Sequence, residues 1–327
     1  MTTSHPGSDD RFQLSREHLL LGVDGGGSKT AAFVASLNRA GEIHVLGRGF
    51  AGSSNLLLSA TELSVASLNQ AVDQALDEAN LECGSMDCTV LALAGSTLPD
   101  VRNVVAAWTK TRQLTSHVVI IHDVYPVLVS GTDHAWGIAL IIGTGSVAFG
   151  VDPAGATITR GGWGHWLGDK GSGFDLGRKA LAAVVESSDD IGPETMLTDM
   201  VLEKLGASNP REILKYLSSG VDTRRDIAAI APIVLDAAER QDRVARLIIS
   251  DAVAEAVKLV ASVSKGLALS RPYPLALAGG VVSGSQYFRD ELSDLLGRMQ
   301  PAPEKISVVY EPVMGCLKIA QAKLLRP

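Results

Sequence analysis

The chain has 327 residues, of which 46% are hydrophobic and 20% are charged. This length favours two domains, each large enough to bury a core of its own. The formal net charge of −7, with no cluster of Lys and Arg, argues against a nucleic-acid-binding surface, because neutralising phosphates needs clustered basic residues. An anionic ligand would have to be met locally, by backbone N–H groups and a metal ion.

Cysteine usage and the hydropathy pattern indicate a reduced, cytoplasmic protein. Cys83, Cys88 and Cys316 do not form a four-ligand metal pattern. No apolar run approaches the ~18 residues of a membrane span, so no membrane partner is expected. Residues 1–17 are polar, and we expect a flexible tail there rather than a signal peptide.

The first part of the chain alternates short strand-like runs with helical patterns. The expected strands are Leu19–Val23, Ala31–Leu37, Ile43–Gly49, Thr89–Ala94 and Val118–Ile121, and the expected helices are Ser59–Asn80 and Leu98–Thr111.

A second strand–turn–strand segment repeats the plan of the first. Gly137–Ile142 is an apolar run, Gly143–Ser146 is a turn that carries hydroxyl groups, and Val147–Val151 returns as a strand. Residues 19–37 have the same order of apolar strand, glycine-rich turn and second strand. This weak internal repeat predicts two α/β domains of related construction.

The chain after Gly173 is mainly helical, with a strand at Leu275–Leu277 that ends in Gly279 and Gly280. No low-complexity linker divides it. We expect an N-terminal domain over residues 18–132, a larger domain over residues 133–311, and a final helix over residues 312–325.

The first glycine-rich turn, which follows Asp24, has the composition of a phosphate-binding nest. Three glycines, Ser28, Lys29 and Thr30 supply a bend, consecutive N–H donors and two hydroxyls. A Walker A loop is excluded because Ser28 stands where Gly must precede the lysine. A dinucleotide fingerprint is excluded because a strand, rather than a helix, follows the glycines. A hairpin tip without a ligand stays open, but the Asp24 carboxylate is suited to hold Mg²⁺.

Val23–Thr30 resembles the first phosphate motif of the sugar kinase, actin and heat-shock chaperone ATPase superfamily. More narrowly, it is similar to that of the N-acetylglucosamine kinase and BadF/BadG/BcrA/BcrD ATPase family. The resemblance implies two ribonuclease-H-like α/β domains flanking a nucleotide cleft, with ATP and Mg²⁺ as cofactors. It also implies that the final helix, residues 312–325, packs back on the N-terminal domain. The ATP-binding residues that it implies are Gly25, Gly26, Gly27, Ser28, Lys29, Thr30, Gly143, Thr144, Gly145, Ser146, Gly279 and Gly280, with Asp24 at the metal.

Asp123 follows a buried-type strand, where active-site residues of open α/β sheets collect. A lone Asp at a strand end is also a common cap or turn residue. The family has its catalytic aspartate in the matching place, before the second phosphate motif, so the resemblance implies that Asp123 accepts the proton of the attacking hydroxyl and contacts the substrate. His122 is expected to be its hydrogen-bonding neighbour.

The segment Gly161–Gly173 is similar to the GGWG…GDxGS motif of N-acetylglucosamine kinases. The resemblance implies sugar contacts from Gly162, Trp163 and Asp169, and from Asn55 after the third strand. A core-packing loop, in which two tryptophans simply fill space, is the other interpretation. Lys170 departs from the family, where an acidic residue is usual. Facing the pocket, it would favour a neutral or acidic sugar over glucosamine; facing solvent, it would have an effect within about 1 kcal/mol.

These residues together predict an amino-sugar kinase that transfers the γ-phosphate of ATP to the C6 hydroxyl of N-acetylglucosamine or a related hexosamine. Glucosamine and N-acetylmuramic acid remain alternative substrates. An ATPase that activates a redox enzyme is another alternative, although the three cysteines lack the closely spaced pattern that holds its iron–sulfur cluster. A sugar-sensing regulator without catalysis is a third. A homodimer is common among such kinases.

Overall fold

The computed structural model describes residues 16–57, 60–115, 117–132, 135–218 and 223–325. The chain divides into two compact units, one formed by residues 1–123 with 313–327 and the other by residues 124–312. The tail expected over residues 1–17 lies outside the described residues, apart from Arg16 and Glu17.

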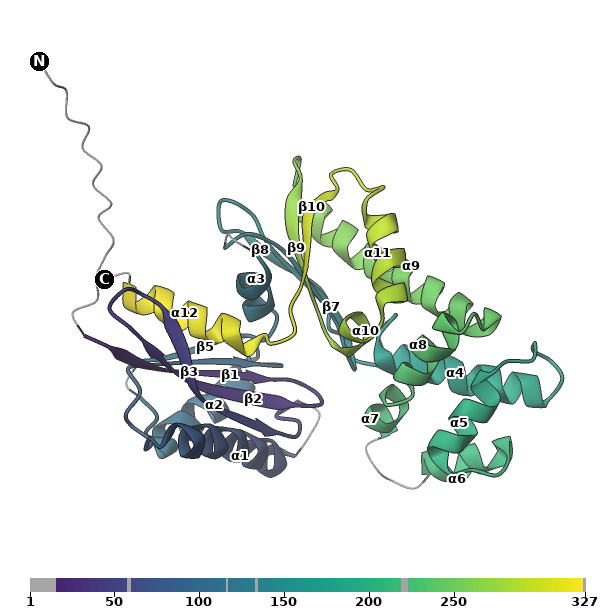
Figure 1. Cartoon of the computed structure of the whole chain (residues 1–327), viewed down its shortest axis with the longest axis horizontal. Helices are drawn as coiled ribbons and strands as arrows, with labels where there is room; N and C mark the ends of the chain where they lie inside the picture. The colour runs from purple at the N-terminus through teal and green to yellow at the C-terminus, as the bar shows by residue number, and fades with distance from the viewer. Residues whose placement is uncertain (1–15, 58–59, 116, 133–134, 219–222, 326–327) are drawn as a thin grey trace, which may run out of the picture. The chain divides into compact units, whose positions relative to one another are not determined.

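The first unit is a five-stranded sheet with helices on both faces (Figure 1). Its strand order is β3-β2-β1-β4-β5, with β1 antiparallel to β2 and parallel to β4. The elements are β1 (His18–Gly25), β2 (Thr30–Leu37), β3 (Ile43–Ala51), α1 (Thr61–Ala79), β4 (Cys88–Leu93), α2 (Pro99–Arg112), β5 (Val118–His122) and α12 (Val313–Leu325).

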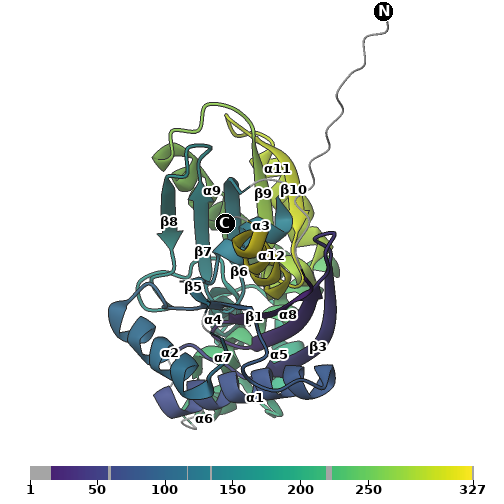
Figure 2. The same ribbon diagram turned by 90° about the vertical axis from the view of Figure 1, so that its left-hand side faces the viewer.

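Successive side chains along a strand point to opposite faces of the sheet. Each face of this sheet therefore packs against different helices. Leu21 and Val34 are paired across β1 and β2, and both belong to the core that α1 and α2 complete. Gly22 and Phe33, one residue on, face the opposite side, where Cys316 of α12 lies against Gly22. Figures 1 and 2 show α12 and the pair α1 and α2 on opposite faces of the sheet. The C-terminal helix is therefore part of the N-terminal unit.

Two glycines of β3 let α1 lie directly on the sheet. A Cβ atom at Gly47 or Gly49 would overlap the backbone carbonyls of Ala75 and Ala71 in α1. The close approach needs residues without side chains, so the packing of α1 on the sheet requires these glycines.

The second unit is also a five-stranded sheet, with order β10-β9-β6-β7-β8. Its strands are β6 (Gly137–Ile142), β7 (Ser146–Val151), β8 (Thr157–Gly161), β9 (Tyr273–Ala278) and β10 (Pro303–Val308). Its helices are α3 (Tyr125–Gly131), α4 (Gly173–Ser188), α5 (Leu197–Leu205), the short 3₁₀ turn η1 (Pro210–Glu212), α6 (Ile213–Ser218), α7 (Thr223–Ala228), α8 (Ala231–Glu239), α9 (Arg243–Gly266), α10 (Gly280–Gly284) and α11 (Gln286–Leu296).

The central strand β6 separates two cores in this unit. Ile138, Leu140 and Ile142 face the larger core, which includes residues of α4, α8 and α9. Ala139 faces a smaller core that α3 completes through Val127 and its neighbours. Alternation of an apolar strand thus buries both faces of the sheet, as expected for a strand at the centre of an α/β unit.

Both sheets have the same topology when the strands of each are counted from the first strand of its own hairpin, β1 or β6. In each, three antiparallel strands are followed by two parallel strands added on the other side of the first strand. This confirms the predicted pair of ribonuclease-H-like α/β units and the internal repeat. The repeat is longer than the sequence indicated, because β8, which completes the second meander, was not predicted.

The chain passes from the first unit to the second after Asp123, whereas the sequence placed this boundary after residue 132. The difference is α3. Gly131 of this helix lies against Ala276 of β9, and a Cβ atom there would overlap it. Helix α3 therefore belongs to the second unit. Among the described residues, no helix has the length and apolar character needed to cross a membrane.

Candidate functional site

Asp24 and Asp123 lie at the same edge of the first sheet. Strands β1, β4 and β5 are parallel, so their carboxyl ends meet there. Asp24 is the penultimate residue of β1, and Asp123 directly follows β5. The topology thus brings together two carboxylates that are 99 positions apart in sequence.

The pKa of Asp24 reports this proximity. Burial first, and then the charge of the Asp123 carboxylate, raise the pKa of Asp24 from 3.8 to about 7, although Lys29 acts in the opposite direction. A raised pKa means that the negative charge of Asp24 is under-compensated by the protein alone. A cation at this edge would relieve that cost.

His122 holds one oxygen of the Asp123 carboxylate. Its Nδ1 lies 2.8 Å from Asp123 Oδ1, and both side chains are about one quarter exposed. This is the hydrogen-bonding neighbour expected from the sequence. The contact occupies Oδ1 and leaves Oδ2 to face another partner.

The first glycine-rich turn is tied to the loop that follows β3. The Thr30 hydroxyl is buried and contacts the Gly52 carbonyl oxygen at 2.7 Å and Ser54 Oγ at 2.8 Å. The Gly26 carbonyl accepts from Ser54 N–H at 3.3 Å. A Cβ atom on Gly25 would overlap Ser54 Oγ, whereas one on Gly26 would have space. Thr30 therefore supports the turn from behind, while Ser28 and Lys29 are exposed at its tip.

Asn55 belongs to the same loop and is buried. Its Oδ1 accepts from the Leu57 N–H at 3.0 Å, which fixes the orientation of the side-chain amide. Its NH₂ group is then the part of the side chain that remains to donate to a ligand. The loop thus couples a candidate sugar-binding residue to the first turn through Ser54.

The second glycine-rich turn, Gly143–Ser146, uses part of its hydrogen-bonding capacity internally. Gly143 N–H donates to Gly145 O at 2.9 Å, and Gly143 O accepts from the N–H of Gly173, the first residue of α4, at 2.7 Å. Ser146 donates its N–H to Asp169 and its hydroxyl to Lys170 O, both at 3.0 Å. Within the described part of the chain, the N–H groups of Thr144 and Gly145 have no such partner and remain to meet a phosphate.

Asp169 lies behind this turn rather than at an open surface. Its side chain is only 3% exposed, and its backbone has a positive φ of 53°. Oδ1 accepts from Ser146 N–H, and Oδ2 lies 3.3 Å from Arg224 of α7, whose side chain is 15% exposed. In this conformation both carboxylate oxygens are committed within the second unit, and Arg224 is a site residue that the sequence did not indicate.

The strand end at Gly279 adjoins the second turn. Gly279 has a φ of 102°, and a Cβ atom there would overlap the carbonyl of Ile142 and approach the N atom of Gly143. Gly280 then begins α10. The structure therefore places the candidate nucleoside motif directly beside the candidate phosphate turn.

The glycine–tryptophan loop lies between β8 and α4. Gly162 N–H donates to Ser146 O at 2.9 Å, so the loop begins at the second turn. Trp163 and Trp166 are both strongly exposed, at 73% and 87%, which rules out the core-packing interpretation for them. Lys170 is exposed as well, although its backbone carbonyl contacts Ser146.

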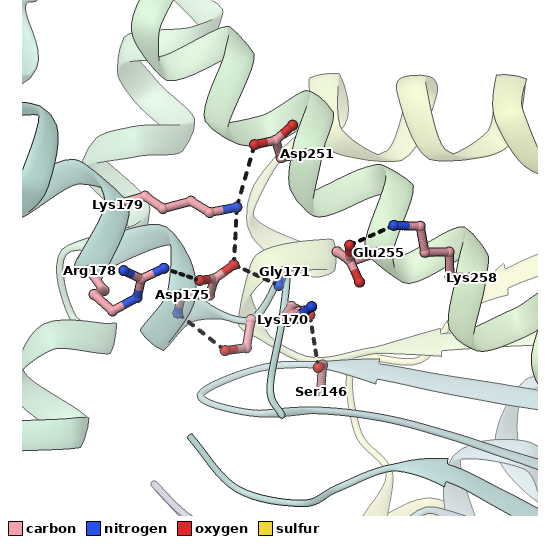
Figure 3. A network of polar contacts seen from close by, with 10 residues as sticks. Ser146, Lys170, Gly171, Asp175, Arg178, Lys179, Asp251, Glu255 and Lys258 are labelled. Carbon is pink, nitrogen blue, oxygen red and sulfur yellow. Dashed lines mark hydrogen bonds and ion pairs between the residues drawn. The ribbon is translucent and has the colours of Figure 1, made fainter. Parts of the chain in front are cut away.

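Asp175, in the first turn of α4, fixes the other end of this loop (Figure 3). It accepts from Gly171 N–H at 3.0 Å and contacts Arg178 at 3.1 Å and Lys179 at 3.2 Å. Burial opposes the charge of Asp175, but the Gly171 hydrogen bond and Lys179 outweigh it and lower the pKa of this carboxyl. The ionised form therefore stabilises the loop.

The edge of the sheet at Asp24 offers few protein ligands. That number fits Mg²⁺ bound together with a nucleotide better than a metal that protein groups alone coordinate. Among the described residues, no group of three or more His, Cys, Asp and Glu side chains could hold a metal ion. Mg²⁺ in nucleotide sites usually takes one or two carboxylates together with phosphate oxygens and water. Asp24 fits that description. The three cysteines are free thiols, with Cys83 exposed and Cys88 and Cys316 buried.

Two units of one topology, each with a glycine-rich hairpin turn at its first two strands, define the duplicated ribonuclease-H-like class that contains sugar kinases and actin-like ATPases. Within that class, the chain belongs to the BadF/BadG/BcrA/BcrD ATPase family, whose model matches residues 21–320. Membership of an ATPase family implies that ATP is used.

Relatives of known name span nearly the whole chain. An N-acetylmuramic acid/N-acetylglucosamine kinase of Clostridium acetobutylicum is 28% identical over 305 residues, covering 93% of this chain and 98% of the relative. An N-acetyl-D-glucosamine kinase of Dictyostelium discoideum is 28% identical over 320 residues, covering 94% and 98%. A solved structure from Chromobacterium violaceum, described as a candidate N-acetylglucosamine kinase, has a TM-score of 0.70 at 24% identity and covers 94% of this chain and 99% of its own.

Proposed function

We propose that the protein is an ATP-dependent amino-sugar kinase that transfers the γ-phosphate to the C6 hydroxyl of N-acetylglucosamine or a closely related hexosamine. The observation that carries the proposal is the pair Asp24 and Asp123 at one sheet edge, beside the first glycine-rich turn. A sugar kinase needs a cation for the phosphates and a base for the hydroxyl, and this edge offers one carboxylate for each. The names of the two long relatives support the sugar class.

In this proposal Asp24 holds Mg²⁺, directly or through water. The metal would neutralise charge on the transferring phosphate. The raised pKa of Asp24 supports the assignment, because an under-compensated carboxylate at the phosphate turn gains most from a divalent cation. Exposed Ser28 and Lys29 at the tip of the first turn, together with the Gly27 N–H, would contact the phosphates, whereas the Gly26 N–H donates to Lys29 O within the turn.

The second turn would bind phosphate oxygens through Thr144 and Gly145, whose N–H groups are not used within the described fold. Ser146 would then act by shaping the turn, because both of its donors are committed to the Asp169–Lys170 segment. Gly279 and Gly280 would lie beneath the nucleoside.

The hydroxyl on C6 would attack the γ-phosphorus while its proton passes to Asp123, so that the sugar phosphate and ADP are the products. His122 holds Asp123 Oδ1, which leaves Oδ2 for the hydroxyl. A positioned base contributes typically ~10²–10⁴-fold in rate, and alignment and charge stabilisation supply the rest.

Asn55 would donate to a sugar hydroxyl through its NH₂ group, and exposed Trp163 would offer its ring face to the sugar. Gly162 would let the backbone approach the ring closely. The Asp169 side chain is only 3% exposed, so a direct sugar contact would require its carboxylate to become accessible. Lys170 is exposed, so its effect on a cationic sugar is expected to stay within about 1 kcal/mol.

A panel of sugars with Mg-ATP, followed as ADP release in a coupled assay, tests the proposal. The panel contains N-acetylglucosamine, glucosamine, N-acetylmannosamine, N-acetylmuramic acid and glucose. We expect the highest kcat/KM for N-acetylglucosamine, with N-acetylmuramic acid as the second candidate because the Clostridium relative is named for both sugars. ATP hydrolysis that no sugar accelerates would instead favour an ATPase that activates a partner enzyme.

A further inference from the structure

The ion pair between buried Asp169 and partly exposed Arg224 lies directly against the second glycine-rich turn. A Cβ atom built on Gly145 would come 2.8 Å from Asp169 Oδ1, 2.9 Å from Oδ2 and 3.0 Å from an Arg224 Nη atom. The space that a side chain would occupy at this position is thus filled by a carboxylate and a guanidinium. A side chain at this position would have to displace the carboxylate, the guanidinium or both.

The same carboxylate connects the turn to a distant helix. Asp169 Oδ1 accepts from Ser146 N–H, and Oδ2 faces Arg224, which is 55 positions later in the chain on α7. The two side chains are 3% and 15% exposed. A buried carboxylate without a counter-charge is costly, so the geometry of Asp169 depends on Arg224. Arg224 has a further donor, Nε, that is buried and has no hydrogen-bond partner among the described residues.

We propose that Arg224 is a positioning residue for nucleotide binding, acting through Asp169 on the turn Gly143–Ser146. The guanidinium fixes the carboxylate, the carboxylate holds the Ser146 N–H, and this keeps the free N–H groups of Thr144 and Gly145 directed for a phosphate. The assignment rests on the proposed role of this turn in binding ATP. The proposal predicts that loss of Arg224 weakens the binding of nucleotides that carry a β-phosphate more than the binding of AMP.

The experiment measures the Kd of ADP and of AMP by titration calorimetry for wild-type protein and Arg224→Gln, without any sugar. Loss of the positioned turn is expected to weaken ADP at least tenfold, the effect of losing about one hydrogen bond to a charged group. AMP lacks the β-phosphate, so its Kd is expected to change less than twofold. Arg224→Lys keeps the positive charge beside Asp169 and is expected to recover most of the ADP affinity.

Arg211→Gln is the matched control, because this arginine lies in the same unit and its side chain is 83% exposed. It should leave both Kd values unchanged. If Arg224→Gln fails to fold, the double variant Asp169→Asn with Arg224→Gln removes both buried charges, and the same loss of ADP affinity is expected from it.

An ADP Kd within twofold of wild type in a folded Arg224 variant would overturn the proposal. Equal weakening of ADP and AMP would also overturn it, since that pattern means general distortion of the unit. Because these titrations need no turnover, they are independent of the sugar panel. Failure of every sugar to react would sink the kinase assignment and leave the Arg224 result to be judged separately.

Discussion

Asp24 and Asp123 are two carboxylates whose proximity at one sheet edge, added to burial, brings the pKa of Asp24 to about 7. The neighbouring Asp123 charge is the second-largest cause, after desolvation. The two aspartates therefore have different proposed roles. Asp24, with its raised pKa, favours a cation, whereas Asp123, with one oxygen held by His122, can accept a proton.

The raised pKa of Asp24 predicts a pH-dependent cost to stability. Below pH 3.8 the group is protonated in both states. Between pH 3.8 and about 7 the folded state keeps a proton that the unfolded state has lost, so the free energy of unfolding falls as pH rises. Above pH 7 the full cost is present, up to ~4 kcal/mol at 1.36 kcal/mol per pKa unit.

Asp24→Asn should therefore be more stable than wild type at pH 8, and this gain should shrink steadily toward pH 5. Urea unfolding of the full chain in EDTA measures it, with the exposed Asp77→Asn as the control whose effect stays flat with pH. A gain for Asp24→Asn that is equal at pH 5 and pH 8 would contradict the raised pKa.

We expect the Thr30 hydroxyl to stabilise the loop that carries Asn55 more than it contributes to phosphate binding. Thr30→Val removes the contacts to Gly52 and Ser54 in a buried place, which should cost ~1–3 kcal/mol of stability. Because Ser54 adjoins Asn55, the KM for the sugar should rise more than the KM for ATP. Thr30→Ser retains the hydroxyl and serves as the control. Steady-state kinetics in which Thr30→Val raises only the KM for ATP would show that the hydroxyl binds phosphate instead.

His122 is expected to orient Asp123 rather than to bind ATP. In His122→Ala the Asp123 carboxylate loses its 2.8 Å contact, and kcat should fall about tenfold, which corresponds to one hydrogen bond to a charged group. The KM for ATP should stay within twofold. His44→Ala, at a side chain that is 60% exposed, is the comparison. An unchanged kcat in His122→Ala would exclude the orienting role.

Asp175 is expected to stabilise the protein in its ionised form. Its lowered pKa means that this contribution is complete above the pKa of the unfolded carboxyl and is lost as pH falls through the folded value. At pH 7, Asp175→Asn should lower the free energy of unfolding by ~1–3 kcal/mol. Asp251→Asn is a matched control, because Asp251 contacts the same Lys179 but is 73% exposed. Equal effects of the two substitutions would contradict the assigned importance of Asp175.

The strand pattern of the sequence indicated a weakly repeated hairpin, and the resemblance to the ATPase superfamily implied the duplicated fold. Apolar runs ending in Gly25 and Gly143 have local composition that strands and tight turns require, and their repetition indicates two related units. β8 was missed because Thr157–Gly161 is short and only half-buried, so its hydropathy does not stand out. The end of the first unit was misplaced because the packing of α3 depends on β9, more than 130 residues later.

Candidate site residues could be proposed from the sequence where they belong to one local motif. Arg224 could not, since its partner Asp169 lies 55 positions earlier and neither local sequence contains the other. The sequence also did not show that Thr30, Ser146 and Asp169 form hydrogen bonds within the protein. Composition cannot tell whether a polar side chain contacts a ligand or another part of the fold.

Identification of the reaction product tests the central claim most directly. Wild-type protein, Mg-ATP and N-acetylglucosamine are incubated together, and the product is examined by ³¹P and ¹³C NMR, with Asp123→Asn in parallel. We predict stoichiometric ADP and a sugar phosphate whose phosphorus couples to C6, formed ~10²–10⁴-fold more slowly by Asp123→Asn. Inorganic phosphate as the sole phosphorus product besides ADP, at a rate independent of sugar and of Asp123, would contradict the assignment of an amino-sugar kinase.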